Sequence, residues 1–86
     1  MVYTEGFLDD ASYIWSSTVQ ERLERALEAI EAFPLIGSRA IAPSIREEFG
    51  PSVFKVVVKP FDLIYEYDAE LDIVIVYGLV HFREAK

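Results

Sequence analysis

The chain has 86 residues, of which 52% are apolar, a formal net charge of −7 and no cysteine. A chain of this length makes one domain over residues 1–86, near the lower size limit for folding alone. The absence of cysteine excludes disulfides and thiolate metal sites. The excess of acid argues against nonspecific nucleic-acid binding, because lysine and arginine contribute most of that affinity. The large apolar fraction leaves open a homodimer or another partner chain.

Targeting signals are not evident in the sequence. The first residues lack the basic run and the apolar run of a signal peptide. The longest apolar run, Ile73 to Val80, has the length of a strand rather than the ~20 residues of a membrane helix. We therefore expect a cytoplasmic protein without a membrane-spanning segment.

Charge is distributed unevenly along the chain. Residues 1–34 carry seven acids and two bases, residues 35–61 two acids and four bases, and residues 62–86 six acids and two bases. The middle segment, with net charge +2, is the only one of the three with an excess of base. This excess predicts a local basic face where the middle segment meets Arg83. The simpler interpretation is that these charges are solvated and only keep the protein soluble.

Two amphipathic helices are predicted before Pro34, which ends the second because the residue before a proline resists the α conformation. Thr4 is a suitable N-cap for the first helix, and either Thr18 with Glu21 or Ser17 with Gln20 fits a capping box for the second. Apolar residues at helical spacing give the first helix one face, formed by Phe7, Leu8, Ala11, Ile14 and Trp15. The corresponding stripe of the second consists of Val19, Leu23, Ala26, Leu27, Ile30 and Phe33. Together they predict a helical hairpin.

The segment from Leu35 to Ser52 is the least regular part of the chain. It contains two glycines and two prolines. Within it, residues 44–50 carry the signals of one helical turn, capped by Ser44 and Glu47 and ended by Gly50.

From residue 54 on, the spacing of apolar residues changes to the two-residue period of β-strands. Residues 54–59 alternate, which places Lys55 and Lys59 on one face and apolar side chains on the other. Pro60 cannot donate a ladder hydrogen bond and therefore marks a turn or an edge.

Two further strands complete the pattern. Residues 61–67 form the second and residues 68–72 a hairpin loop. Residues 73–82 are nearly all apolar, as expected of a strand covered on both faces. With a short strand ending at Tyr3-Thr4, the sequence predicts an α+β fold of the order β-α-α-β-β-β. We expect the helical hairpin on one face of a mainly antiparallel sheet.

Four short pieces, in this order and spacing, resemble a known family. They are the helix end Ala29–Gly37, the turn Lys59-Pro60-Phe61, the strand piece Leu63-Ile64-Tyr65 and the ending Val80-His81-Phe82-Arg83. Together they resemble the RelE/ParE superfamily, the toxin halves of bacterial type II toxin–antitoxin pairs, also known as plasmid stabilisation proteins. The resemblance covers nearly the whole chain.

The resemblance implies a fold and two activities. The helical hairpin would pack on one face of the sheet, and the other, concave face would bind the target or the antitoxin. RelE-like members cut messenger RNA at the ribosome, using basic residues and a late His, Tyr or Arg without a metal. ParE-like members poison DNA gyrase instead. A cognate antitoxin wraps either kind with its C-terminal segment.

Three departures favour the ParE-like, protein-binding kind. Phe54 stands where many members carry an arginine, and Tyr65-Glu66 stands where many read Tyr-Arg. The chain is also acidic, whereas the nucleases are strongly basic. The alternatives are a RelE-like endonuclease and a decayed toxin or binding module without activity.

The candidate site residues are basic and late in the chain. Counting alternation from Ile73, His81 and Arg83 share a face. If that face coincides with the one carrying Lys55 and Lys59, the four side chains converge. Lysine and arginine would then hold phosphate while His81 acts as acid or base.

Binding without chemistry is the second interpretation of these residues. His81 and Arg83 would then anchor an antitoxin carboxylate, pair with acids of the chain itself, or simply end an edge strand. Arg46 and Tyr65 join Lys55 and Lys59 in the predicted target- or antitoxin-binding surface.

No motif points to a metal or a cofactor, and we expect none. The acids Asp68, Glu70 and Asp72 lie in the predicted hairpin loop without calcium-loop spacing. The sequence has no glycine-rich phosphate loop and no nucleophile elbow. Trp15 and the strand tyrosines are expected to be core residues rather than stacking platforms.

Overall fold

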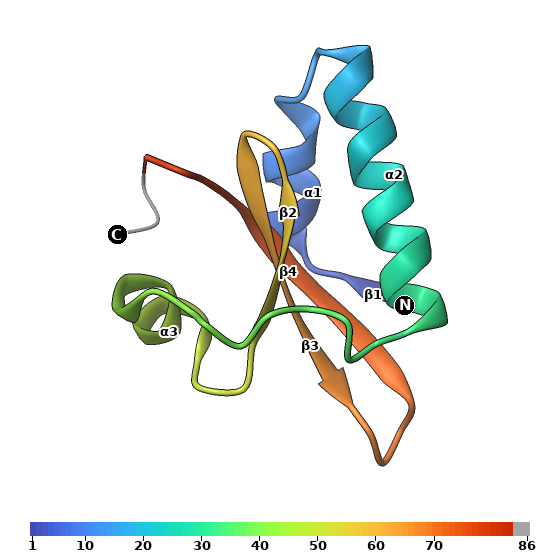
Figure 1. Ribbon diagram of the computed structural model, residues 1–86, viewed down its shortest axis with the longest axis vertical. Helices are drawn as coiled ribbons and strands as arrows, with labels where there is room; N and C mark the ends of the chain where they lie inside the picture. Colours follow the sequence, from blue (N-terminus) through green and yellow to red (C-terminus); the bar gives the residue numbers. More distant parts are fainter. Residues whose placement is uncertain (84–86) are drawn as a thin grey trace.

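Four strands form one mixed sheet that helices cover from both sides (Figure 1). This computed structural model describes residues 1–83. The strand order is β1-β4-β3-β2. The two-residue strand β1 (Val2–Tyr3) is parallel to β4 (Ile73–His81). The remaining pairs, β4 with β3 (Phe61–Asp68) and β3 with β2 (Phe54–Val58), are antiparallel. The predicted α+β class and mainly antiparallel sheet are confirmed.

The helices α1 (Glu5–Ser12) and α2 (Ser17–Ala32) form the predicted hairpin and lie together on one side of the sheet (Figure 1). The Oγ1 of Thr4 accepts a hydrogen bond from the Phe7 N–H at 3.1 Å, so the predicted N-cap of α1 is confirmed. The main core lies between this hairpin and the sheet. Its buried members are Phe7, Ile14, Leu23, Ala26, Ile30, Phe54, Val58, Leu63, Tyr65, Val74, Val76 and Leu79.

Two residues of the predicted inner face of α1 point to solvent. Trp15 is 88% exposed and Leu8 is 55% exposed. The predicted core position of Trp15 is wrong because α1 ends at Ser12, before the helical periodicity reaches it. In the connecting segment only Ile14 turns inward, and its neighbours Tyr13 and Trp15 point outward.

The ends of α2 also differ from the prediction. Its N-cap is Ser16, whose Oγ accepts from the Val19 N–H at 3.4 Å, rather than Thr18 or Ser17. Pro34 follows the helix as predicted, but Phe33 lies at the C-cap with φ −137° and leaves the buried stripe. Phe33 is therefore exposed instead of packed.

A third helix, α3 (Pro43–Phe49), covers part of the opposite face of the sheet. Successive residues of a strand point to opposite faces, and Leu63 belongs to the hairpin core whereas Ile64 packs under α3. The predicted helical turn and its end at Gly50 are confirmed. The predicted cap is wrong, because Ala42 is the N-cap and Pro43 occupies the first turn. The resemblance implies that the sheet face opposite the hairpin is open, but α3 covers part of that face.

The two turns of the sheet lie where they are predicted. Lys59 and Pro60 connect β2 to β3. Residues 69–72 connect β3 to β4, and the Asp68 side chain accepts hydrogen bonds from two backbone N–H groups of this loop, at 3.0 and 3.2 Å. No helix among the described residues is long and apolar enough to cross a membrane.

A β-bulge in β4 changes which side chains face the hairpin. Ile64 pairs with Gly78 but Tyr65 pairs with Val76, so Tyr77 is an extra residue. As a result Val76 and Leu79, three positions apart, both lie in the hairpin core. The alternation that starts at Ile73 is therefore reversed beyond the bulge.

Candidate functional surfaces

The structure divides the predicted site residues between the two faces of the sheet. Lys55 pairs with Ile64, which packs under α3, so Lys55 lies on the α3 face. His81 pairs with Phe61, which packs against the hairpin core, so His81 lies on the other face. The predicted convergence of Lys55 with His81 is wrong, because the bulge shifts the alternation of β4 by one residue.

Lys59, His81 and Arg83 lie at the same end of the sheet. The Phe82 N–H donates to the Pro60 carbonyl at 3.1 Å, which ties the end of β4 to the β2–β3 turn. Arg22 of α2 joins them, because its Nη1 donates to the Lys59 carbonyl at 3.1 Å. We call Arg22, Lys59, His81 and Arg83 the turn-end cluster.

The His81 ring is oriented by two contacts. Its edge-to-face contact with Phe61 has a centroid distance of 5.5 Å. Its Nδ1 accepts a hydrogen bond from the Arg83 backbone N–H at 3.1 Å. A nitrogen that accepts has no proton, so the neutral ring carries its proton on Nε2. In this arrangement the neutral His81 donates through Nε2, which suits binding an anion better than abstracting a proton.

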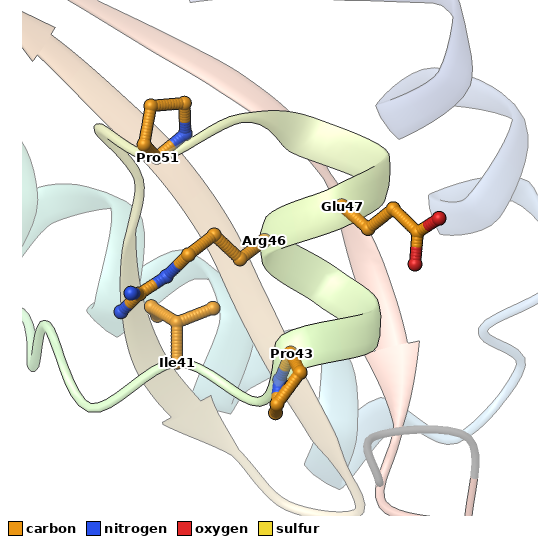
Figure 2. A pocket seen from close by; sticks show the side chains of 5 residues that line it. All are labelled: Ile41, Pro43, Arg46, Glu47 and Pro51. Atoms are coloured by element: carbon orange, nitrogen blue, oxygen red, sulfur yellow. The ribbon is translucent and has the colours of Figure 1, made fainter.

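Three further basic residues, Arg39, Arg46 and Lys55, lie on α3 or near the segment that precedes it. The Arg39 guanidinium lies 4.9 Å from the Phe54 ring centroid, and its Nη2 donates to the Pro51 carbonyl at 3.3 Å. Lys55 exchanges two backbone hydrogen bonds of 2.8 Å with Ser38, the residue before Arg39. Arg46 lies on α3 beside Pro51 (Figure 2). We call Arg39, Arg46 and Lys55 the α3 cluster; it contains three of the four bases of the middle segment, whereas Lys59 lies with Arg83 in the turn-end cluster.

Tyr65 does not lie on a surface. Its side chain is fully buried and its ring stacks on Phe54 with a centroid distance of 5.3 Å. Its hydroxyl donates to the Pro34 carbonyl at 2.7 Å and accepts from the Gly37 N–H at 2.9 Å. Burial raises the pKa of Tyr65 above its ordinary value, although the Gly37 hydrogen bond acts in the opposite direction. The prediction that Tyr65 contacts a partner conflicts with this position.

An exposed apolar surface follows α2, and the sequence reasoning did not identify it. Phe33 and Leu35 are each 68% exposed and Ile36 is 48% exposed. With Ala32 and Pro34 they line a shallow depression of about 430 Å³. We call residues 32–36 the apolar surface. The sequence feature that could have indicated this surface is the apolar run of residues 32–36, which has neither helical nor strand periodicity.

The described residues contain no group of three or more His, Cys, Asp or Glu side chains arranged to hold a metal ion. The acids of the 68–72 loop have other contacts, since Asp68 binds the loop backbone and Asp72 accepts from the Tyr67 hydroxyl at 2.7 Å. That hydrogen bond is the main reason why the pKa of Tyr67 is raised.

Comparisons with known proteins identify no relative. No protein-family model matches the chain, and neither a curated protein nor a solved structure matches it.

Proposed function

We propose that this protein is the toxin half of a bacterial type II toxin–antitoxin pair of the RelE/ParE kind, acting in the cytoplasm by binding a protein. The order of its elements supports this proposal: a short strand, a helical hairpin and then three antiparallel strands. The packing of the hairpin on one face of the sheet is the arrangement that the resemblance implies.

The apolar surface is the observation that carries the protein-binding role. Phe33, Leu35 and Ile36 expose large apolar side chains within four positions. Isolated exposed apolar residues are ordinary, but contiguous ones mark interaction sites. A partner such as DNA gyrase or the cognate antitoxin would bury this surface and gain roughly 25 cal/mol per Å² of apolar area removed from water.

The separation of the basic residues supports binding over RNA cleavage. Cleavage without a metal needs phosphate-binding cations and a proton-transfer group at one site. Lys55 lies on the face opposite His81. The formal net charge of −7 also opposes the approach of RNA.

The turn-end cluster favours the second candidate function, a metal-independent messenger-RNA endonuclease. It places His81 near Lys59 and Arg83 at one end of the sheet. The cations would hold the phosphate while the neighbouring 2′-hydroxyl of the RNA attacks the phosphorus. An imidazolium at His81, with its Nδ1 released from the Arg83 N–H, would give its Nε2 proton to the leaving 5′-oxygen. This candidate function requires the turn-end cluster to provide both phosphate binding and proton transfer without Lys55.

Growth after induced expression tests the proposal, with messenger-RNA integrity and DNA supercoiling measured in the same culture. We expect growth arrest with intact messenger RNA. A change in supercoiling would identify gyrase as the target. Arrest with cut messenger RNA would instead support the endonuclease, and normal growth would leave a binding module or decayed toxin.

A further inference from the structure

A pocket of about 390 Å³ lies beside α3, and its wall combines apolar groups with one arginine and one glutamate. The lining residues are Ile41, Pro43, Arg46, Glu47 and Pro51. Figure 2 shows the Arg46 side chain reaching across toward Ile41, whereas Glu47 extends from the other side of α3. The guanidinium is therefore the charged group beside Ile41, whereas the Glu47 carboxylate points away from it.

The pocket is preformed by the packing beneath it. Ile41 packs against the buried cluster of Ile45, Val53, Ile64 and Val80, which joins α3 to the sheet. The two prolines in the wall have a fixed φ and no N–H donor. An occupant therefore needs little ordering of the protein, which reduces the cost of binding.

The local charge is positive on an acidic molecule. Within residues 1–83, the Arg46 side chain has no hydrogen-bond or ion-pair partner. The Arg39 guanidinium donates to the carbonyl of Pro51, so a second positive charge lies at the edge of the pocket. Lys55 is joined to Ser38, the neighbour of Arg39. An unpaired guanidinium between apolar walls is best complemented by a carboxylate, which can accept two parallel hydrogen bonds from it.

We propose that this pocket binds an acidic segment of a partner protein that carries an apolar anchor. The anchor packs against Ile41 and the prolines, and a neighbouring carboxylate binds Arg46. This inference rests on the proposed function, since the partner in question is then the antitoxin. Nucleic acid is a poorer occupant, because a long polyanion meets the overall charge of −7.

Fluorescence anisotropy with the full-length protein and a labelled peptide of alternating leucine and glutamate tests this proposal. The matched probe has lysine in place of every glutamate. We expect the glutamate peptide to bind at least about tenfold more tightly, because a charge-assisted hydrogen bond contributes more than a neutral one. Equal affinity, or tighter binding of the lysine peptide, would overturn the proposal.

Two variants locate the binding site. Arg46→Glu should weaken binding of the glutamate peptide by about tenfold or more. Arg46→Gln, which removes the charge without reversing it, should weaken binding by a smaller factor. Arg25→Glu makes the same charge reversal on the exposed side of α2 and should change the affinity less than about twofold. Similar losses in the Arg46→Glu and Arg25→Glu variants, both folded by circular dichroism, would contradict the assignment.

Failure of this inference can be distinguished from failure of the proposed function. Growth arrest without Arg46-dependent peptide binding would leave the toxin role standing and remove the pocket as its acidic-segment site. Peptide binding without growth arrest would keep the pocket and remove the toxin role. Self-association of the free chain that Arg46→Glu abolishes would assign the pocket to a second copy and overturn the partner stated here.

Discussion

Tyr65 shows how one side chain can fix a segment without regular structure. Its hydroxyl binds the Pro34 carbonyl and the Gly37 N–H, and thereby holds the chain that leaves α2 against the sheet. A methyl group on Gly37 would lie 2.6 Å from the Tyr65 hydroxyl oxygen and 2.8 Å from the Phe54 Cβ. Position 37 therefore requires glycine, because no space is left for a side chain. The position of the apolar surface thus depends on the two hydrogen bonds of the Tyr65 hydroxyl.

We expect Tyr65→Phe to lower the free energy of unfolding by about 1–3 kcal/mol at neutral pH, because two hydrogen bonds to half-buried backbone groups are lost. The cost should shrink as pH rises above 10. The unfolded tyrosine ionises near its ordinary pKa of 10.0, whereas the folded pKa is raised, so the wild type loses stability through this window. Urea unfolding at pH 8 and at pH 10.5 measures both effects. Tyr13→Phe, at a residue 74% exposed, is the control. A difference between wild type and Tyr65→Phe that is independent of pH would contradict the argument.

His81 provides a second test at the scale of a residue. If the protein acts by binding alone, His81→Ala and Arg83→Ala should leave growth arrest unchanged while circular dichroism confirms the fold. Their side chains belong to the turn-end cluster and not to the apolar surface. Loss of arrest in either folded variant would support the endonuclease or a binding role for the cluster.

At the scale of elements, α1 is joined to β4 by side chains as well as by packing. Thr4 Oγ1 accepts from the Phe7 N–H and donates to the Tyr77 carbonyl at 3.0 Å. The Asp10 carboxylate accepts from the Leu79 N–H at 3.0 Å. These bonds satisfy the backbone of β4 where β1 has ended and beside the bulge. The cap of α2 has no such second role, because Ser16 is exposed and binds only its own helix.

The two caps should therefore differ in their contribution to stability. We expect Thr4→Ala to lower the free energy of unfolding by about 1–2 kcal/mol, since it removes a cap and a tertiary hydrogen bond. Ser16→Ala should cost about 0.5–1 kcal/mol, because its bond is longer and exposed. Thermal and urea unfolding measure both, with Thr4→Ser as the conservative variant that retains the hydroxyl. Equal costs for Thr4→Ala and Ser16→Ala would show that the bond to β4 contributes nothing.

Local patterns were sufficient to predict most elements but not their contacts. Helical spacing, a proline stop and alternation identified α1, α2 and the three long strands, because each is determined by its own residues. The bulge at Tyr77 was not predictable, since it results from how β4 meets β3. It decided the candidate site, as it moved His81 to the face opposite Lys55.

Burial was the other property that local patterns could not determine. Trp15 looks like a core residue by spacing, yet α1 ends three residues before it. The predicted binding surface includes Tyr65 although strand tyrosines are expected in the core, and the segment that follows α2 encloses it in the core. In both cases the outcome depends on where a distant or neighbouring segment runs.

At the scale of the molecule, the surfaces differ in chemistry. The apolar surface lies at the end of α2. In the α3 cluster, Lys55 lies on the sheet face that α3 covers and Arg46 lies on α3 itself, whereas the Arg39 guanidinium lies over the Phe54 ring. Most of the acids lie in the first 34 and the last 25 residues of the chain. Such a distribution lets two partners, or two segments of one partner, bind without competing for the same residues.

A charge on the apolar surface should separate stability from function. We expect Leu35→Asp to leave the free energy of unfolding within about 0.5 kcal/mol of wild type, because the side chain is largely exposed. It should nevertheless abolish growth arrest, since a carboxylate in an apolar interface loses its hydration. Leu8→Asp, at an exposed leucine on α1, is the matched control and should keep arrest. Arrest that survives Leu35→Asp would show that this surface does not bind the target.

The inner position of β4 has a consequence for how the protein forms in the cell. During synthesis β4 leaves the ribosome after every other described strand, yet β1 and α1 depend on it for their hydrogen bonds. The bond between Thr4 and Tyr77 spans 73 positions of sequence. Such distant contacts make folding slow, and the nascent helical hairpin keeps its apolar stripe uncovered until the last strand arrives. A newly made chain thus passes through a period of vulnerability to aggregation and proteolysis, which a chaperone or a partner made alongside it would shorten.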